Sequence, residues 1–411
     1  MSPQVIFIII VAIVVADFLF KSRLDYLNLK NLSEKLPAEL SDMYDHEQYR
    51  KSQQYERVNI RFGLMTGIFN LLLILLMLFT DGFNTVNNMA AGVSGHPILQ
   101  PLIFFMILAL ALDLLNTPFS VYHTFVIEQK FGFNRITPKL YVTDKLKNWI
   151  LSAIIGGGVM ALVIWFYLLT TTFFWIWTWA LASGFMLLMI SFYSSLIVPL
   201  FNKQQPLEEG ELKQSITRHA EQAGFHIDNI YTIDGSKRST KANAYFSGMG
   251  RKKRIVLYDT LVKELSTDEI VAVLLHEIGH YKKKHIIYSM ILSILQAGIM
   301  LFILSLFISN AALSQALGAE HASFHVGLIA FGILYGPISV VIGLIMNVSS
   351  RRCEYQADAF AAHHNMKKEL IGALKKLSIA NLSNLTPHPL YVFFHYSHPT
   401  LLQRIKKLTG R

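Results

Sequence analysis

Residues 276–309 read HEIGHYKKKHIIYSMILSILQAGIMLFILSLFIS, and two unlike kinds of sequence meet within this stretch. It opens with two histidines four residues apart, and three consecutive lysines follow. From residue 286 to residue 309 it carries no charged side chain, a run long enough to cross a bilayer core, which requires about 20 helical residues. Upstream, Ser266 and Glu269 have the spacing of a capping box, and no proline follows before residue 309. We therefore expect one helix to begin after Ser266 and to run unbroken into the apolar segment.

Six further apolar runs of similar length occur elsewhere in the chain. They lie near residues 4–20, 63–80, 101–117, 150–170, 172–200 and 326–349. With 53% hydrophobic and only 16% charged residues, the chain of 411 residues is too apolar for a typical soluble protein. The sequence thus predicts an α-helical membrane protein with about seven transmembrane helices.

The basic residues predict how these helices are oriented. All 37 Lys and Arg fall within residues 21–61, 130–147, 203–284 and 351–411. Seven spans place these four stretches on one side of the membrane, and basic loops remain cytoplasmic. We therefore expect the N-terminus outside and the C-terminus in the cytoplasm. No Lys or Arg precedes the first apolar run and no small-x-small cleavage site follows it, which indicates an uncleaved anchor.

Composition also argues against two other interpretations. The net charge of +10 follows from the asymmetry of the loops, whereas nucleic-acid binding calls for basic and aromatic residues interleaved on a soluble surface. Cys353 is the only cysteine, so an internal disulfide is excluded.

Two of the cytoplasmic stretches are long enough to hold a catalytic site. Residues 203–285 contain a helix-like segment at 207–223, strand-like runs at 230–233 and 254–257, and a further strand candidate at 243–246. We expect one integrated domain made of five transmembrane helices with cytoplasmic loops (1–202), a catalytic segment (203–285), two further transmembrane helices (286–349) and a mostly helical C-terminal segment (350–411).

The pattern His276-Glu277-Ile278-Gly279-His280 predicts a zinc site. Residues four apart lie on one face of a helix, so the two imidazoles can bind one metal ion. Glu277 follows the first ligand and can take a proton from the attacking water as general base. The alternative is a chance pair of histidines on a core-facing helix. The apolar residues before the motif favour the metal site, because a dry environment strengthens metal electrostatics.

A catalytic zinc commonly has three protein ligands, and Glu354 is the best third candidate. It follows the span at 326–349 by a few residues, and His280 precedes the span at 286–309 by six, about 9 Å of helix. Both sets of ligands are therefore expected just inside the cytoplasmic boundary. Asp358 lies four residues after Glu354 and can accept a hydrogen bond from the other nitrogen of a liganding histidine. The alternative is a solvated acidic pair that balances Arg351 and Arg352.

Several blocks in the same order resemble the Ste24-type CAAX prenyl proteases, which are integral-membrane zinc peptidases of the M48 type. The resemblance covers nearly the whole chain. It rests on HEIGHYKKKH (276–285), EYQADAFA (354–361), NTPFSVYHTFVIEQKFGFN (116–134), DGSKRSTKANAYFSG (234–248) and FHYSHPTLLQRI (394–405). It implies a ring of about seven helices around an internal chamber, with a gluzincin-like site at the cytoplasmic face. Asn70, Asp113 and Gln296 within the spans agree with a polar interior.

The same resemblance implies residue roles. His276, His280 and Glu354 would bind one Zn²⁺ per chain, Glu277 would be the general base, and Asp358 would support the ligands or donate a proton. Asn243 would lie on an edge strand that pairs with substrate backbone. His398 and Arg404 would steady the oxyanion of the tetrahedral intermediate.

Other residues near these motifs receive different interpretations. We expect His285 to point away from the ligand face, His388 and His395 to be structural, and Cys353 to have no metal role. Lys282–Lys284 is interpreted as an anchor at the membrane interface.

The predicted function is a zinc-dependent membrane endopeptidase that cuts near the C-terminus of prenylated proteins or peptides. A membrane quality-control protease without a prenyl requirement remains an alternative, and an ion transporter is a remote one. The predicted partners are a peptide or protein substrate and the lipid bilayer. The compact length and the C-terminal Leu408-Thr-Gly-Arg411, without a lysine-rich retrieval signal, favour a bacterial cytoplasmic membrane over an endoplasmic reticulum.

Overall fold

The computed structural model describes the chain except residues 34, 37–44, 228, 249–252 and 411. Within the described part, six helical segments are long and apolar enough to cross a membrane, and two helices that meet at a 55° bend are together long and apolar enough for a seventh span. The predicted set of about seven transmembrane helices is confirmed.

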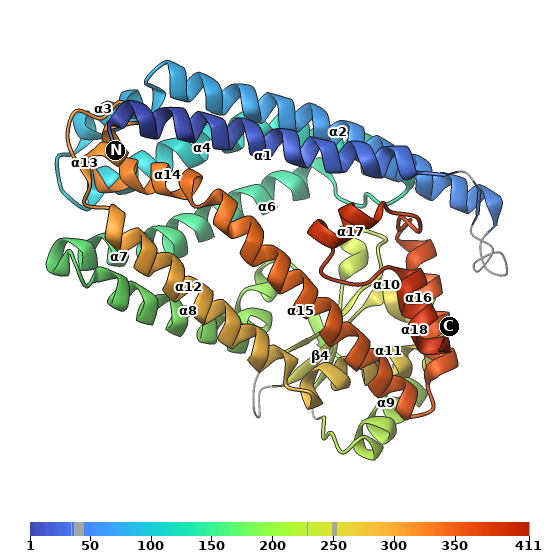
Figure 1. The fold of residues 1–411 in the computed structure, drawn as a ribbon. Coiled ribbons are helices and arrows are strands. Elements are labelled where there is room, and N and C mark those ends of the chain that lie inside the picture. The colour runs from blue at the N-terminus through green and yellow to red at the C-terminus, as the bar shows by residue number, and fades with distance from the viewer. Residues whose placement is uncertain (34, 37–44, 228, 249–252, 411) are drawn as a thin grey trace.

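Long helices make up the first half of the chain (Figure 1). Local π-helical turns (η2 and η3) interrupt two of them without ending the helical path. The elements are α1 (Pro3–Asn31), α2 (His46–Phe79), α3 (Gly82–Val93), α4 (Leu99–Tyr122), η2 (His123–Glu128), α5 (Gln129–Phe131), α6 (Pro138–Leu151), η3 (Ser152–Gly156), α7 (Gly157–Thr170) and α8 (Phe174–Leu196). The later spans are α12 (His285–Phe307) and the bent pair α14 (Phe324–Leu334) and α15 (Gly336–His363), with the short α13 (Ala311–Gln315) between α12 and α14.

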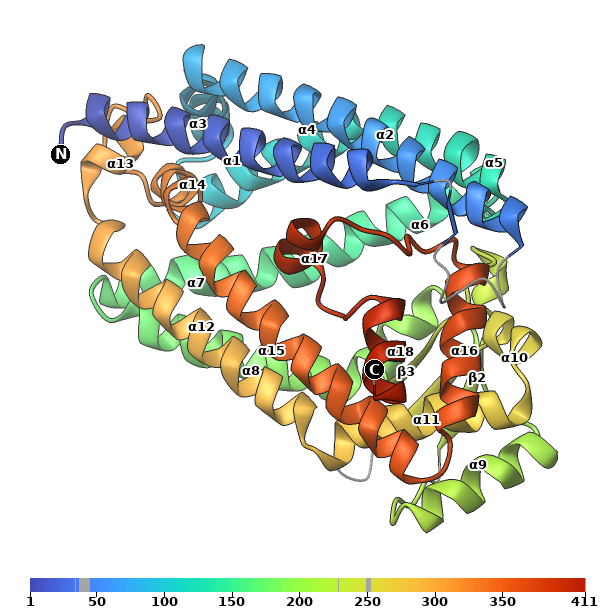
Figure 2. The same ribbon diagram turned by 45° about the vertical axis from the view of Figure 1, so that its right-hand side comes forward.

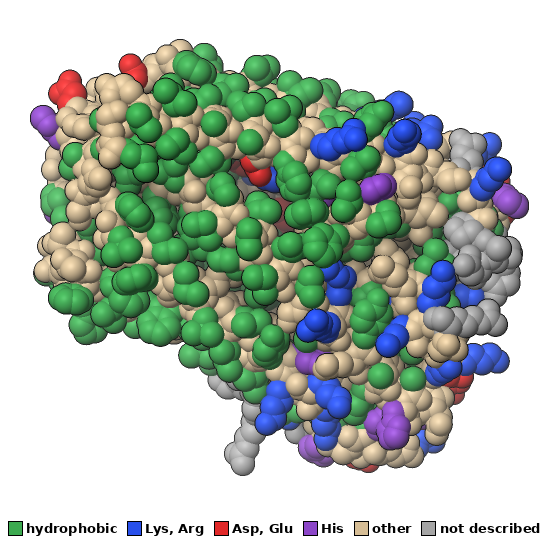
Figure 3. All heavy atoms as spheres, in the orientation of Figure 1, with side chains coloured by type: hydrophobic (Ala, Val, Ile, Leu, Met, Phe, Trp, Pro, Cys, Tyr) green, Lys and Arg blue, Asp and Glu red, His purple; other side chains and the backbone are tan. Residues whose placement is uncertain are grey.

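The two ends of the long helices differ in what they carry. In Figures 1 and 2 the N-terminus, α3 and α13 lie at one end, and the strands and the C-terminal helices lie toward the other. Figure 3 shows hydrophobic side chains over the long helices, whereas Lys and Arg side chains gather over the strand-bearing end. The same face is hollowed near its middle, where an acidic side chain is visible among hydrophobic ones. The surface thus has the apolar band and the basic end expected of a membrane protein.

Polar side chains within the spans find partners in one another. Asp113 forms an ion pair of 2.7 Å with Lys145 and accepts a hydrogen bond of 3.1 Å from the indole of Trp149. The amide of Asn116 donates to that of Asn70 at 3.3 Å. These contacts offset the cost of polar groups at membrane depth.

The strand-bearing end combines a small sheet with helices that cover it. The sheet has the order β1-β2-β4-β3, in which β2 and β4 are parallel and the outer pairs are antiparallel. Its strands are β1 (Gln204–Pro206), β2 (Ile230–Ile233), β3 (Ala244–Ser247) and β4 (Arg254–Tyr258), and its short 3₁₀ turns are η4 (Val198–Leu200) and η5 (Gly235–Lys237). The helices are α9 (Glu211–Gln222), α10 (Asp259–Glu264), α11 (Thr267–Lys282), α16 (Lys367–Ala380), α17 (Pro389–His395) and α18 (Leu401–Thr409). A buried apolar cluster joins the sheet to α9, α11 and α16, so α11 is held by packing on several sides.

The start of α11 is as predicted, but its end is not. The side chain of Ser266 caps the helix, and the carboxylate of Glu269 accepts a hydrogen bond from the Ser266 N–H at 2.8 Å. The predicted unbroken helix into the membrane is wrong, because α11 ends at Lys282 and Lys284 adopts a left-handed conformation with φ of 59° before α12 begins. No proline or glycine marks this bend.

Two of the sequence blocks hold the sheet segment against the first half of the chain. Asn134 and Ser239 form an isolated antiparallel bridge, and the N–H of Thr240 donates to the carbonyl of Phe133 at 3.1 Å. Arg238 binds Asp144 through two nitrogens, at 2.9 and 3.0 Å. The blocks at 116–134 and 234–248 therefore contact each other in the folded chain.

Candidate metal centre

Close packing of α11 on α15 brings together residues that lie about 75 positions apart. Gly279 faces α15, and a Cβ at this position would lie 3.0 Å from Cβ of Phe360 and 3.1 Å from Cα of Ala357. Contacts of this length are tighter than nine in ten real Cβ contacts, so the glycine within the HExxH pattern permits the close approach of the two helices. His276 and His280 on α11 consequently face Glu354 on α15.

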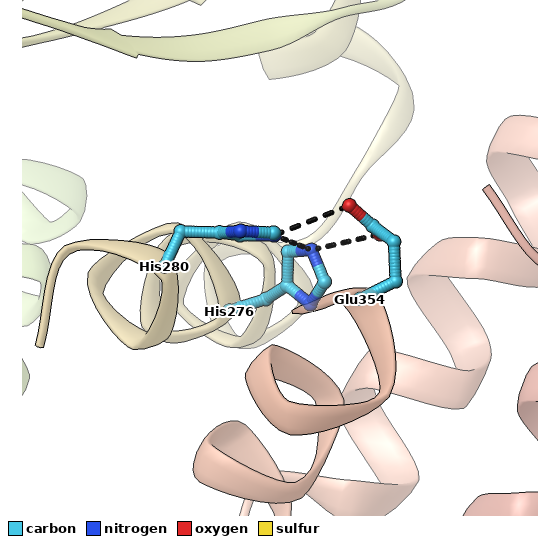
Figure 4. A group of neighbouring side chains, drawn as sticks. All are labelled: His276, His280 and Glu354. Atoms are coloured by element: carbon cyan, nitrogen blue, oxygen red, sulfur yellow. Dashed lines mark hydrogen bonds and ion pairs between the residues drawn. The ribbon is translucent and has the colours of Figure 1, made fainter. Parts of the chain in front are cut away.

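The three side chains converge on one point (Figure 4). The Nε2 atoms of His276 and His280 lie 3.2 Å apart. Glu354 places Oε1 3.3 Å from His280 Nε2 and Oε2 3.5 Å from His276 Nε2. Each residue thus offers one ligand atom, and the three lie within 4.8 Å of one another.

The donor set fits a metal ion. Oε2 of Glu354 is buried without a hydrogen-bond partner in the described chain, an arrangement that is costly unless another group binds it. Two imidazole nitrogens and one carboxylate are the ligands that zinc takes at catalytic sites with three protein ligands.

Asp358 and Arg404 form a layer behind His276. The Nδ1 of His276 lies 2.9 Å from Oδ1 of Asp358, and the Nε of Arg404 donates to Oδ2 of Asp358 at 2.8 Å. A second nitrogen of Arg404, Nη2, contacts Oδ1 of the same carboxylate. The carboxylate is therefore shared between the imidazole and the guanidinium, an ion pair that sequence patterns did not indicate.

The electrostatics of this layer favour positive charge at the ligands. Burial alone would lower the pKa of His276, but the neighbouring carboxylates of Asp358 and Glu354 raise the pKa to about 9. Burial likewise opposes the charge of Arg404, and its bond with Asp358 more than compensates and raises the pKa of the guanidinium. The carboxylates that stabilise an imidazolium here would also stabilise a bound metal cation.

His285 contradicts the expectation that it points away from the ligands. Its Nδ1 lies 3.1 Å from Nδ1 of His280, its Nε2 lies 2.8 Å from Oε1 of Gln356, and the side chain is buried. The prediction assumed one continuous helix, whereas the bend at Lys284 turns His285 back toward His280. His285 and Gln356 are therefore site residues that sequence reasoning missed.

Glu277 follows the ligand His276 in the chain, and His398 contacts the ligand Glu354. Glu277 is half-buried and has no hydrogen bond or ion pair with any described residue, so its carboxylate is available. His398 places Nε2 3.2 Å from Oε1 of Glu354, while its side chain stays 64% exposed. Arg404 adds a third nitrogen, Nη1, at 3.7 Å from Oε2 of Glu354.

Asn243 lies one residue before β3, at the edge of the sheet. Its carbonyl accepts from the N–H of Tyr258, and its side chain accepts from the N–H of Ala244. Because β3 pairs only with β4 among the described strands, its second edge has no strand partner in this part of the chain. Among the described residues no hydrogen bond joins Asn243 to the metal ligands, so the structure brings it to the sheet edge and not into the cluster.

Other candidates stand apart from the cluster. The ring of His388 caps α17 by accepting from the N–H of Leu390, a structural contact as expected. Cys353 is not among the clustered ligands of the described chain.

Two family models together match nearly the whole chain. Residues 25–203 match the model described as CAAX prenyl protease N-terminal, five membrane helices. Residues 206–411 match the peptidase family M48 model.

Individual relatives agree with these matches. The chain is 36% identical to CAAX prenyl protease 1 of Saccharomyces cerevisiae, over 96% of this chain and 93% of the relative. It is 33% identical to the CAAX prenyl protease 1 homolog of Arabidopsis thaliana, over 98% and 97% of the two chains. The crystal structure of S. mikatae Ste24p matches with a TM-score of 0.94 and 38% identity, over 98% of this chain and 99% of that chain. These relatives are eukaryotic, and they give no support to the expected bacterial origin.

Proposed function

The chain belongs to peptidase family M48 and is a multi-pass membrane metallopeptidase of the CAAX prenyl protease type, and from this premise we propose that zinc is its metal and prenylated peptides are its substrates. His276, His280 and Glu354 would hold the ion. The observation that carries the proposal is the convergence of these ligands beside a carboxylate, Glu277, that has no partner of its own.

The proposed chemistry assigns one task to each residue. Bound zinc would supply Lewis acidity and make hydroxide available near neutral pH. Glu277 would accept the proton of the attacking water and pass it to the amine of the leaving peptide. Asp358 would hold the imidazole of His276 in position through Nδ1, and Arg404 would hold Asp358.

Substrate would bind in extended form. A peptide can add to the open edge of β3 near Asn243, where main-chain hydrogen bonds hold it without demanding a particular sequence. His398 would donate to the oxyanion of the tetrahedral intermediate, since its exposed ring lies at the ligand cluster. Arg404 would contribute through Nη1, which faces Glu354.

We further propose that this site lies on the cytoplasmic side, with the N-terminus outside. The Lys and Arg side chains that gather at the strand-bearing end support this orientation (Figure 3). The names of the relatives support a prenyl requirement over general quality control, and the matches leave the ion-transporter alternative without support.

The test compares a farnesylated peptide that ends in a CAAX sequence with its unmodified counterpart. Wild type, Glu277→Gln and Glu264→Gln would be assayed, and zinc content would be measured in each. Glu264 is an exposed glutamate on α10 and serves as the matched control. We expect wild type and the control to cut the farnesylated peptide, and Glu277→Gln to keep zinc but lose roughly 100-fold or more in turnover.

Each part of the proposal fails on a separate result. Turnover by zinc-loaded Glu277→Gln at the wild-type rate would remove Glu277 as the base. Equal cleavage of both peptides would replace the prenyl requirement with the quality-control function.

A further inference from the structure

A cavity of about 740 Å³ opens between α12 and α15, and His285, which contacts the ligand His280, is among its lining residues, whereas none of the three metal ligands lines it. Its walls have two distinct characters. Apolar side chains from both helices line one part, among them Ile287, Ile291 and Ile345, and Phe393 of α17 contributes to the same wall. Basic side chains line the other part.

The basic part is formed by Lys283, Lys284 and Arg352. All three are exposed, and none of their side chains has an ion pair or hydrogen bond with a described residue. No carboxylate occurs among the described residues that line the cavity. Three cationic side chains therefore line one cavity, and no acidic side chain in its described lining balances their charge.

The backbone adds to this positive charge. Helix α12 begins at His285, and its N-cap residue, Lys284, makes no side-chain capping bond. The first N–H groups of a 23-residue helix are thus left for another acceptor at the point where the three cations lie. A helix N-terminus with free N–H groups favours an anion.

The apolar part of the cavity belongs to the membrane. Ile291 and Ile345 are 49% and 61% exposed and lie within the spans formed by α12 and by the bent pair α14–α15. Figure 3 shows basic side chains where the hydrophobic surface of these helices ends. The cavity therefore crosses the boundary between hydrocarbon and headgroups, with apolar walls on one side and cations on the other.

We propose that this cavity binds an anionic phospholipid. The phosphate of the headgroup lies between Lys283, Lys284 and Arg352 at the start of α12, and an acyl chain follows the apolar walls. Charge complementarity selects this occupant: a zwitterionic lipid such as phosphatidylcholine brings its own ammonium beside its phosphate and adds no net charge to balance the three cations, and a soluble anion leaves the apolar wall unused.

The occupant would act on the bend that serves the metal centre. Lys284 has φ of 59°, and the next residue, His285, contacts His280. A phosphate bound at the N-terminus of α12 would stabilise the bend and with it the position of His285. Binding of the lipid does not depend on the proposed peptidase chemistry, so its test is independent of activity.

The experiment is a lipid titration of the purified full-length protein in neutral detergent, read by native mass spectrometry. Dioleoylphosphatidylglycerol and dioleoylphosphatidylcholine would be compared on wild type and on a variant carrying Lys283→Gln, Lys284→Gln and Arg352→Gln. The matched control carries Lys263→Gln, Lys367→Gln and Lys368→Gln, which removes three exposed charges from the extramembrane helices α10 and α16. We expect wild type and the control to prefer phosphatidylglycerol. The cavity variant should bind it roughly 100-fold more weakly, on the basis of roughly fivefold for each cation.

Several results would overturn the proposal. Wild type could bind the two lipids with equal affinity, or the cavity variant could keep the preference for phosphatidylglycerol, and either result would refute the lipid site. Displacement of the lipid by millimolar inorganic phosphate would indicate a soluble-anion site instead. An increased KM for the farnesylated peptide, without a change in phosphatidylglycerol binding, would make the cavity a substrate site. Should the triple variant fail to fold, Arg352→Gln alone is expected to weaken binding about fivefold.

Discussion

Replacing Asp358 with asparagine tests whether the layer behind His276 determines metal affinity. The carboxylate accepts from Nδ1 of His276 and Nη2 of Arg404 at Oδ1, and from Nε of Arg404 at Oδ2. Asparagine has one acceptor oxygen and one NH₂ group. In either orientation of the amide, its NH₂ group faces an N–H donor of Arg404. In one of the two orientations it also faces Nδ1 of His276.

The expected loss follows from these contacts. Loss of a carboxylate that orients a liganding histidine commonly weakens metal binding about 10- to 100-fold, or about 1.4–2.8 kcal/mol. Arg404 would also remain charged and largely buried without a full partner, with a side chain only 12% exposed, which lowers stability. Zinc affinity would be measured by competition with a chromophoric chelator, and the unfolding temperature on the same samples.

Asp144→Asn is the matched control. Asp144 also holds an arginine, Arg238, through two bonds, and both side chains are less than 20% exposed. This pair has no contact with the metal ligands, so the control should lower the unfolding temperature while zinc affinity stays unchanged. If Asp358→Asn binds zinc as tightly as wild type, or if both variants lose zinc equally, the assignment of Asp358 to the metal centre is refuted.

Three further predictions concern α11 and its neighbours. Gly279→Val should force α11 away from α15 and reduce the zinc content of the purified protein to near zero, and a full content would contradict the role of close packing. His285→Phe should weaken zinc affinity about tenfold by removing the contact with His280, whereas an unchanged affinity would make His285 structural only. Burial alone would raise the pKa of Glu269, but its bonds with Lys376 and Ser266 hold the pKa below its ordinary value. Glu269→Gln should therefore lower the free energy of unfolding by about 1 kcal/mol at pH 7. Thermal unfolding of both proteins would be followed against pH. The difference in stability between wild type and variant should shrink as pH falls below about 4.3, and it should vanish below the pKa of Glu269 in the folded state.

Much of the fold and of the ligand cluster could be predicted because it depends on local periodicity. A run of about 20 apolar residues has few alternatives to a membrane helix, and the loops between such runs carry the basic residues. The capping box at Ser266 needs only residues three apart. The i, i+4 spacing places His276 and His280 on one face of α11, and the same spacing places Asp358 on the face of α15 that carries Glu354.

What could not be predicted depends on tertiary contacts or on an unusual backbone conformation. Lysine rarely adopts a positive φ, so nothing in the lysine run marks Lys284 as the end of a helix. The position of His285 follows from that bend, and the prediction that it points away from the ligands was wrong for the same reason. The bond between Arg404 and Asp358 joins residues 46 positions apart, and no local pattern pairs them.

The two ligand-bearing helices are tied to the membrane in different ways, and this difference determines what holds the site in place. Helix α15 runs without a break from Gly336 through the membrane boundary to His363, so Glu354 and Asp358 are rigidly connected to a transmembrane span. Helix α11 is separated from α12 by the bend at Lys284, so the span cannot orient the histidines directly. Their position depends instead on packing against α15 at Gly279 and against the sheet. The depth of the metal centre is therefore set by α15, while α11 supplies two ligands to a position that α15 defines.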